Sequence, residues 1–249
     1  MNVSPAIDTR EETVVEIALQ QVQVGTRRPI LPVTSFTVRS GEVTVQACPT
    51  DQAPTVLALV AGGQMRPSRG KVTYNGRRLR GKLKQRIAIV DAPTVSEPDD
   101  YVTLRRTVAE EYTYIGRVAT AGREQRFLDR HGISDYSDWH MIELPPSVRM
   151  VALTELALLR PETEAVIITT PDRHGGAAGD VYEYSKHVAS RGYAVLCITG
   201  TTAAEEILRD HFNEADHIHL APEEAPMAFQ REAPVNSSSS SSTEGTQAS

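Results

Sequence analysis

A strand, a short loop and an apolar helix follow one another between Gly41 and Gly63, an order typical of a phosphate-binding loop. Such a loop holds a triphosphate through the pattern G-x-x-x-x-G-K-[S/T], because its glycines let consecutive backbone N–H groups surround the phosphate oxygens. The lysine neutralises phosphate charge, and the hydroxyl binds magnesium. The segment ends on Gly62 and Gly63, but the loop itself contains no glycine. The layout indicates a phosphate-binding unit, whereas the residue types do not support its chemistry.

Three other groups of residues could carry chemistry. His217 and His219, beside Asp216, would place two imidazoles on one face of a strand, where they could bind a metal. Because no third ligand is indicated, we favour a surface strand edge and predict no metal site. The loop 172–176 follows a buried strand, where α/β proteins place active-site loops, but no nucleophile and base accompany it, so we favour a remodelled loop. The acidic residues at 97–100 are interpreted as a solvated loop.

Length and composition set the first limits on the class of protein. The chain has 249 residues, 40% of them hydrophobic, which is enough for one sizeable domain or two small ones with a buried core. No apolar run approaches the roughly 20 residues that cross a bilayer, and the amino terminus lacks a secretory pattern. We therefore expect no membrane span and a cytoplasmic location. Cys48 and Cys197 stand in separate apolar stretches, so we expect two buried free thiols.

The charge is unevenly distributed. The net charge is −6, yet Met65 to Arg86 contains nine Lys and Arg residues and no acid. A solvated hairpin and helix face is the preferred interpretation; the alternative is contact with acidic lipid headgroups or an acidic protein surface. Because the rest of the chain is acidic, we predict no nucleic-acid partner.

Short β-branched runs alternate with helical stretches along the chain, which predicts an α/β fold. Two unbroken apolar runs predict central parallel strands that helices cover on both faces. The predicted strands are Thr13–Ala18, Ser35–Val38, Val43–Ala47, Lys71–Tyr74, Ile87–Val90, Ala165–Thr169 and Ala194–Thr199, and the predicted helices start at Pro54 and span Val148–Leu159 and Val181–Arg191.

Composition shifts divide the chain further. A polar, helical stretch over 99–149 reads as a helical subdomain inserted into a core formed by 13–98 and 150–222. Residues 1–12 are predicted to be a flexible amino terminus. The Ser-rich tail at 223–249 is low in hydrophobic residues, so we predict that it is disordered.

From about Val14 to Leu220 the sequence resembles the ATP-binding subunits of ABC transporters. The resemblance rests on Gly41-Glu42, Pro67–Val72, Asn75-Gly76, Val102–Leu104, Leu144, Ala157-Leu158, Pro161, Pro171 and Glu214–Ile218. It implies a P-loop NTPase-like (ABC ATPase) core with a mainly parallel sheet, an antiparallel β subdomain and an inserted helical subdomain.

The resemblance also shows where the family's phosphate-binding groups would fall. The three P-loop glycines correspond to Cys48, Asp51 and Ala53, and the lysine corresponds to Pro54. Thr55 alone keeps the expected hydroxyl. Proline has neither a charge nor an N–H, and Asp51 adds an anion where the triphosphate would sit. We therefore interpret Cys48, Asp51, Ala53, Pro54 and Thr55 as a vestigial P-loop that has become a plain helix start.

The other catalytic positions of the family are replaced as well. The magnesium-binding aspartate and the catalytic glutamate correspond to Thr169 and Thr170, a vestigial Walker B motif. The Q-loop glutamine falls on Asp91 or Ala92, and the switch histidine falls on Gly200. The remaining functional positions of the family are replaced too. The signature motif falls on Leu144-Pro145-Pro146-Ser147-Val148, the dimer-contacting aspartate falls on Gly176, and the adenine-stacking aromatic falls near Gly25.

These replacements predict a pseudo-ATPase with no catalytic residues. We predict no bound cofactor, and place weak anion retention by Thr55 and the helix start second. The expected function is that of a catalytically inactive ABC ATPase-like subunit that serves as a structural or regulatory partner of a membrane complex. One alternative is an ATP-binding subunit that keeps nucleotide binding in a heterodimer, and another is an enzyme with a new site on this fold.

The resemblance implies an integral membrane protein as partner, alone or together with a second ABC ATPase subunit or a second copy of this chain. In the family, a helix of the membrane subunit enters the groove between the core and the helical subdomain, which here involves the stretch Ala92–Arg106. The expected location is cytoplasmic, at the inner face of the membrane. The residues assigned to docking are Ala92, Tyr101, Val102, Leu104, Arg105 and Arg106.

Overall fold

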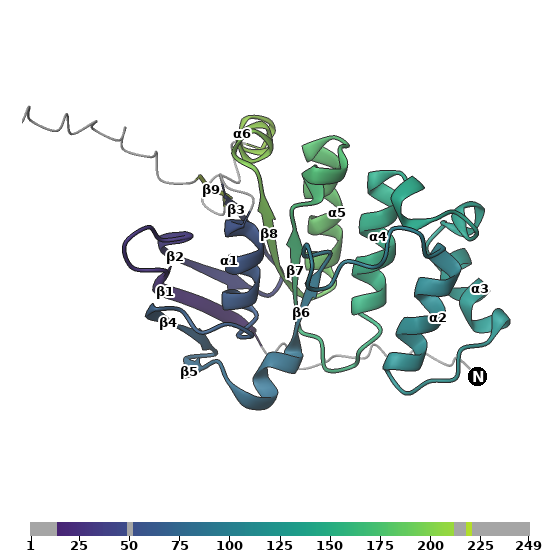
Figure 1. Ribbon diagram of the computed structural model, residues 1–249, viewed down its shortest axis with the longest axis horizontal. Coiled ribbons are helices and arrows are strands. Elements are labelled where there is room, and N and C mark those ends of the chain that lie inside the picture. The colour runs from purple at the N-terminus through teal and green to yellow at the C-terminus, as the bar shows by residue number, and fades with distance from the viewer. Residues whose placement is uncertain (1–13, 49–51, 212–217, 221–249) are drawn as a thin grey trace, which may run out of the picture.

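A five-stranded parallel sheet forms the centre of the computed structural model, which describes residues 14–48, 52–211 and 218–220 (Figure 1). Its strand order is β6-β7-β8-β3-β9, and every neighbouring pair is parallel. These strands are β3 (Val43–Ala47), β6 (Ile87–Val90), β7 (Ala165–Thr169), β8 (Ala194–Thr199) and β9 (Ile218–His219). All residues of β3, β7 and β8 are buried, which explains why these strands appear as unbroken apolar runs.

An antiparallel sheet lies beside the parallel one, with strand order β2-β1-β4-β5. Its strands are β1 (Glu16–Val24), β2 (Leu31–Arg39), β4 (Arg69–Tyr74) and β5 (Arg77–Arg78), followed by a 3₁₀ helix η1 (Gly81–Arg86). The strand β1 bulges at Gln21, which has a left-handed φ of 52°. Gly70 faces this bulge with φ 82°, and a Cβ there would lie 2.2 Å from the Gln21 carbonyl oxygen.

Helices cover both faces of the parallel sheet. One face packs with the antiparallel sheet and α1 (Ala53–Ala61), through side chains such as Ile167 and Leu196. The other face packs on α4 (Pro146–Ala157) and α5 (Ala178–Ser190), through Val166 and Cys197. Alternate side chains of one strand therefore enter two different cores. The last described helix is α6 (Thr201–Asp210).

The helical part of the chain projects from one end of the sheet (Figure 1). It contains α2 (Leu104–Tyr114), α3 (Ala121–Arg130) and the short 3₁₀ helices η2 (Ser134–Tyr136) and η3 (Met141–Glu143). The 3₁₀ helix η4 (Pro171–His174) lies elsewhere, directly after β7. The hydroxyls of Thr103 and Thr120 cap the starts of α2 and α3. Leu104 and Met141 share one hydrophobic cluster with the strand residue Val166, so the helical part is not packed separately.

The parallel sheet, the antiparallel sheet and the flanking helices confirm the predicted fold class. The predicted bounds of β3, β6, β7 and β8 match the observed strands. Other elements differ from the prediction: β1 continues to Val24 through polar residues, and α6 was not predicted. Strands β2 and β4 begin earlier than predicted, and α4 and α5 both begin and end earlier. Helix α6 buries only Ala204 and Ile207, so its apolar pattern is short.

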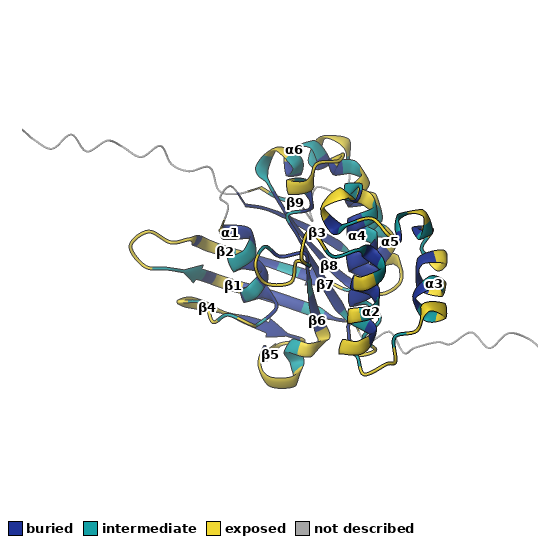
Figure 2. Ribbon diagram, turned by 45° about the vertical axis from the view of Figure 1, so that its right-hand side comes forward, coloured by how far each residue is buried: buried dark blue, intermediate teal, exposed yellow. Residues whose placement is uncertain are grey.

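Burial follows these layers. Figure 2 shows the sheet strands largely buried, while the surface around β5 and η1 is exposed. Among the helices in the part of the chain that the structure describes, none combines the length and the apolarity that a membrane span needs.

Candidate functional site

The ends of β3, β6, β7 and β8 meet at one edge of the parallel sheet, because parallel strands place their carboxyl ends together. The residues that follow these strands are Cys48, Asp91, Thr170 and Gly200. The sequence assigned each of them to a nucleotide-handling position, and the topology brings these four chain segments to the same edge.

The start of α1 supplies few groups that could hold a phosphate. Ala53 and Pro54 are buried in the first turn, Thr55 is half-buried, and Gln52 forms the N-cap without a side-chain hydrogen bond. Cys48 is buried, and its N–H donates to the Thr199 carbonyl oxygen at 2.9 Å. Asp51, the remaining residue of the predicted vestigial loop, lies outside the described residues.

The end of β7 carries two buried hydroxyls. The Oγ1 atoms of Thr169 and Thr170 have no hydrogen-bond partner in the described part of the chain. Thr170 also adopts a left-handed φ of 45°, which is costly for a β-branched residue. Two residues later, the Asp172 carboxylate accepts hydrogen bonds from Thr199 Oγ1 at 2.8 Å and from the Gly200 N–H at 3.1 Å. This carboxylate therefore ties the loop after β7 to the end of β8.

A buried charge network occupies the space beyond β6 and β7. Arg149 of α4 forms a two-pronged ion pair with Asp91, with N–O distances of 2.8 and 2.9 Å. Arg173 reaches the same carboxylate at 3.0 Å, and His174 Nε2 lies 3.1 Å from it. Arg173 also pairs with Glu97 at 2.9 Å. We call Asp91, Arg149, Arg173, His174 and Glu97 the charge network.

The central pair of this network is almost removed from solvent. The side chains of Arg149 and Asp91 are 3% and 8% exposed. Burial raises the pKa of Asp91, but hydrogen bonds from His174 and Arg149, and the charges of Arg149 and Arg173, outweigh it and hold that pKa well below its ordinary value. Asp91 has a left-handed φ of 54°, so its carboxylate is held in place at a conformational cost.

Sequence reasoning placed the Q-loop position on Asp91 or Ala92 and did not find the partners of Asp91. Arg149 and Arg173 lie 58 and 82 residues further along the chain, and no local pattern links them to Asp91. The loop 172–176 was singled out as polar, and two of its side chains prove to face Asp91. Glu97, assigned to a solvated loop, pairs with Arg173.

A groove of about 480 Å³ lies between β6 and helices α2 and α4. Its exposed walls include Val95, Glu97 and Tyr114, and the charge network reaches its floor through Asp91. The lining residues are Gln64, Ile87, Ala88, Ile89, Val90, Asp91, Val95, Ser96, Glu97, Pro98, Thr107, Glu110, Glu111, Tyr114, Leu153, Leu156, Ala157 and Arg160.

The residues assigned to docking lie next to this groove and outside its lining. Ala92 and Leu104 are fully buried, so they support the groove and expose no surface to a partner. Tyr101 is 76% exposed, while Val102 and Arg105 are half-buried. Arg106 is exposed and pairs with Glu110 along α2 at 2.8 Å, and Arg105 bonds Gln125 of α3.

The other positions singled out in the sequence lie apart from the charge network. Pro145 is the N-cap of α4 and Pro146 its first residue, so the signature position forms an ordinary helix start. His219 lies in β9, and its neighbour His217 is outside the described residues. Within the described part of the chain, no three His, Cys, Asp or Glu side chains are grouped as metal ligands.

No protein-family model matches the sequence, and no curated protein matches it. Solved structures do match the fold. A nucleotide-free ATP-binding cassette from an ABC transporter gives a TM-score of 0.58 at 15% identity, over 78% of this chain and 84% of that one. The protein cbiO1 from Clostridium perfringens, part of the ABC transporter complex cbiONQ, gives 0.52 at 17% identity, over 74% and 77%.

A longer protein matches over its shared domain. A bacterial Atm1-family ABC exporter with ATP bound gives a TM-score of 0.55 at 17% identity, over 78% of this chain and 36% of the exporter chain. At these identities the likeness concerns the fold. The chain has the fold of ABC transporter ATP-binding cassettes, as its sequence resemblance implied.

This fold implies a magnesium-bound nucleotide, and the donor groups at the described positions can be compared with what that ligand needs. The first turn of α1 offers one hydroxyl and no lysine, and the end of β7 offers hydroxyls in place of carboxylates. Both oxygens of Asp91 are engaged by cationic or imidazole groups. These groups do not fit a magnesium-triphosphate.

Proposed function

We propose that this chain is a non-hydrolysing subunit with an ABC ATPase fold, acting as a structural or regulatory partner of a transporter-type membrane complex. In this proposal it lies in the cytoplasm, peripheral to the inner face of the membrane. Two features support it: the residue types at the strand ends, and a groove beside them that could receive a partner.

The charge network carries the argument against hydrolysis. Activating a water molecule needs a general base or a group that orients the water, and losing a general base costs a factor of about 10² to 10⁴ in rate. Thr169 and Thr170 stand where the acids would be, and Asp91 is saturated by Arg149, Arg173 and His174. Among the described residues at this edge of the sheet, the carboxylates of Asp91 and Asp172 are both held by other groups of the chain, which supports a subunit without a free catalytic base.

The groove carries the argument for a partner. It combines exposed apolar surface on Val95 and Tyr114, 43% and 75% exposed, with the carboxylates of Glu97, Glu110 and Glu111, each of which pairs with an arginine of this chain. A helix with apolar anchors matches the exposed apolar part of this lining. The solved proteins with this fold include an ABC exporter and a part of the complex cbiONQ, and we infer the same kind of membrane partner here.

Calorimetric titration of the purified chain with ATP and ADP, in the presence of magnesium, tests the first half of the proposal. We expect no binding heat that requires magnesium, because the described part of the site supplies neither a lysine nor a free carboxylate. Micromolar binding that requires magnesium would contradict this half of the proposal, and it would favour the alternative of a regulatory subunit that binds nucleotide in a heterodimer.

Co-purification from detergent-solubilised membranes tests the second half. We expect Tyr114→Ala to reduce recovery of the membrane partner, because the exposed ring of Tyr114 lines the groove. Tyr101→Ala is the matched control, since Tyr101 is 76% exposed and lies outside the groove lining. If Tyr101→Ala alone removes the partner, docking uses the neighbouring surface that the sequence indicated.

A further inference from the structure

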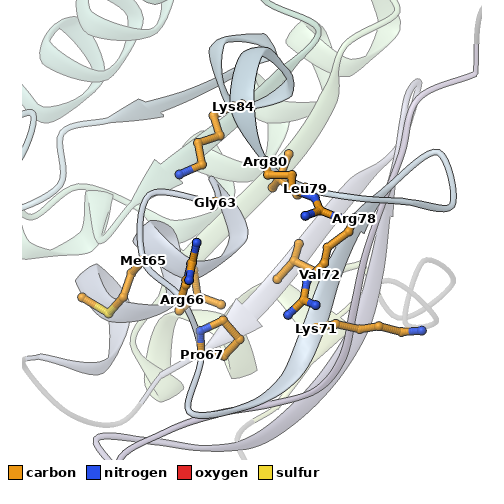
Figure 3. Close-up of a pocket in the computed structure, with 12 residues that line it drawn as sticks. Gly63, Met65, Arg66, Pro67, Lys71, Val72, Arg78, Leu79, Arg80 and Lys84 are labelled. Atoms are coloured by element: carbon orange, nitrogen blue, oxygen red, sulfur yellow. The ribbon is translucent and has the colours of Figure 1, made fainter.

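A second hollow, of about 350 Å³, lies between the carboxyl end of α1, β4, β5 and η1 (Figure 3). Twelve residues line it, and five of them are cationic. They come from four separate places: the loop before β4, β4 itself, β5 with the residues after it, and η1. The five are Arg66, Lys71, Arg78, Arg80 and Lys84.

The lining contains no acid, and neither does the segment from Met65 to Arg86. No acidic side chain in the described ranges forms an ion pair with any of these five cations. This contrasts with Arg86, which ends the same segment and pairs with Glu164. Like charges grouped around a concave surface repel one another and concentrate a positive potential there.

The floor of the hollow is apolar and fixed in place. Val60, Val72 and Leu79 are buried beneath it. Gly63 has φ 69°, and a Cβ at this position would lie 2.8 Å from Leu79, so the turn after α1 packs directly onto the floor. The cations therefore surround a formed concavity and are not spread over a flat surface.

Figure 3 shows how the side chains are arranged around this floor. Lys84, half-buried, and Arg66 point toward one another, while Arg78 and Arg80 approach from the β5 side. Lys71 extends away at the rim. Guanidinium groups that converge from different elements can each give paired N–H donors to a tetrahedral anion.

We propose that this hollow binds a phosphate-bearing anion. Its volume lies near the lower end of the range of small-ligand pockets, about 300 to 1,000 Å³, which suits a phosphate group with a small substituent. A phosphate offers several acceptor oxygens to the grouped guanidinium and ammonium groups. A single carboxylate has two oxygens and would pair with only one guanidinium group in the two-pronged geometry. Both a free phosphorylated molecule and the headgroup of a phospholipid present this chemistry. The inference does not rest on the proposed function, since it uses none of the groove residues.

Isothermal titration with inorganic pyrophosphate, on the full-length chain at low salt, tests the site. We expect Arg66→Glu with Arg80→Glu to lower the affinity at least about tenfold for each guanidinium removed. The matched control is Arg77→Glu with Lys82→Glu, which changes the net charge equally at two exposed cations outside the lining. The control should bind like the unmodified chain.

Thermal unfolding of both variants separates loss of binding from loss of the fold, and Arg66→Gln with Arg80→Gln repeats the test without introducing acids. Absence of pyrophosphate binding to the unmodified chain would overturn the proposal. Equal loss of pyrophosphate affinity in the Arg66→Glu/Arg80→Glu variant and in the Arg77→Glu/Lys82→Glu control would also overturn it. Such a result would mean that pyrophosphate responds to the general surface charge and not to this hollow. Binding confined to an acidic protein, with none to phosphate, would overturn the proposal as well.

Vesicles distinguish the two sources. Flotation with phosphatidylcholine vesicles that contain phosphatidylglycerol, competed by pyrophosphate and absent with phosphatidylcholine alone, would identify a lipid headgroup as the ligand. Pyrophosphate binding without flotation would identify a free phosphorylated molecule. Flotation that pyrophosphate does not compete, and that the pocket variant retains, would overturn the assignment to this hollow.

Discussion

Asp91 ends β6 in a left-handed conformation, with its carboxylate between two guanidinium groups and an imidazole. A carboxylate in such surroundings stays ionised over the whole physiological range, because its negative charge neutralises Arg149, which is almost removed from water, and the partly exposed Arg173. The role of Asp91 is therefore structural. The same position in a working site of this fold would need a group free to exchange partners during each turnover.

Asp91→Ala should be much more damaging than the loss of an exposed ion pair. It leaves Arg149 buried without a counter-charge, which costs about 3 to 5 kcal/mol in the free energy of unfolding. Glu110→Ala, which breaks an exposed pair on α2, should cost about 0.5 kcal/mol or less. Urea titration of the two variants checks this. Similar losses in both would mean that the buried pair contributes little.

The network should also determine the acid sensitivity of the fold. Because folding lowers the pKa of Asp91, its stabilising contribution is complete above its unfolded pKa of about 3.9. The contribution is lost as the pH falls from there toward the folded pKa. The difference in unfolding free energy between the unmodified chain and Asp91→Asn should therefore be constant from about pH 5 to 7 and shrink below about pH 4. A difference that already shrinks between pH 7 and 5 would contradict this assignment.

The elements differ in how far the sequence predicts them. Strands β7 and β8 are apolar throughout because both of their faces are buried, so their bounds could be predicted to the residue. Helix α6 buries two side chains in ten residues, and the polar end of β1 is held by pairing with β2 and β4, so neither shows a clear periodic signal.

The residues of the candidate site also divide into those that the sequence predicts and those that it does not. The family resemblance placed Thr169, Thr170 and either Asp91 or Ala92 at the ends of strands, because apolar runs mark where those strands stop. The partners of Asp91 could not be predicted, since Arg149 lies on a helix whose packing depends on the whole fold. The basic hollow was visible in the sequence only as a run of charge, because its concavity depends on the turn at Gly63.

Two glycines of the antiparallel sheet allow a matched test of the β1 bulge. Gly70 and Gly76 both have left-handed backbone angles, but only at Gly70 would a Cβ collide with backbone, at the carbonyl oxygens of Gln20 and Gln21. Gly76→Ala should cost about 1 kcal/mol for the conformation alone. Gly70→Ala should cost several times more, because β1 and β4 must separate. Thermal unfolding of the two variants gives the comparison. Equal decreases in the melting temperature would mean that the β1 bulge relaxes freely around the added Cβ.

At the scale of the whole molecule, the core and the helical part share one hydrophobic cluster. Leu104, Val108 and Met141 pack with strand residues, and the Asp91–Arg149 pair joins the end of β6 to α4. Neither part can therefore unfold without exposing the buried surface of the other. This arrangement favours one cooperative transition.

The single tryptophan, Trp139, reports on the helical part, because it lies between η2 and η3. Its fluorescence and the far-ultraviolet circular dichroism, which is dominated by the larger core, should change at the same urea concentration. The variant Trp139→Phe supplies the background signal. A fluorescence transition at clearly lower urea would show that the helical part melts by itself.

The Asp91–Arg149 pair has a mechanical meaning as well. A two-part subunit passes force to its partner by changing the angle between its parts, and this requires a joint whose contacts exchange cheaply. Here Arg149 of α4 contacts both sides of the joint: it forms the buried two-pronged ion pair with Asp91 at the end of β6, and its Nη1 donates to the Met141 carbonyl oxygen of η3 at 3.0 Å. Moving the two parts would break contacts of a buried charge. These contacts favour one fixed angle between the core and the helical part, and changing that angle would be energetically costly.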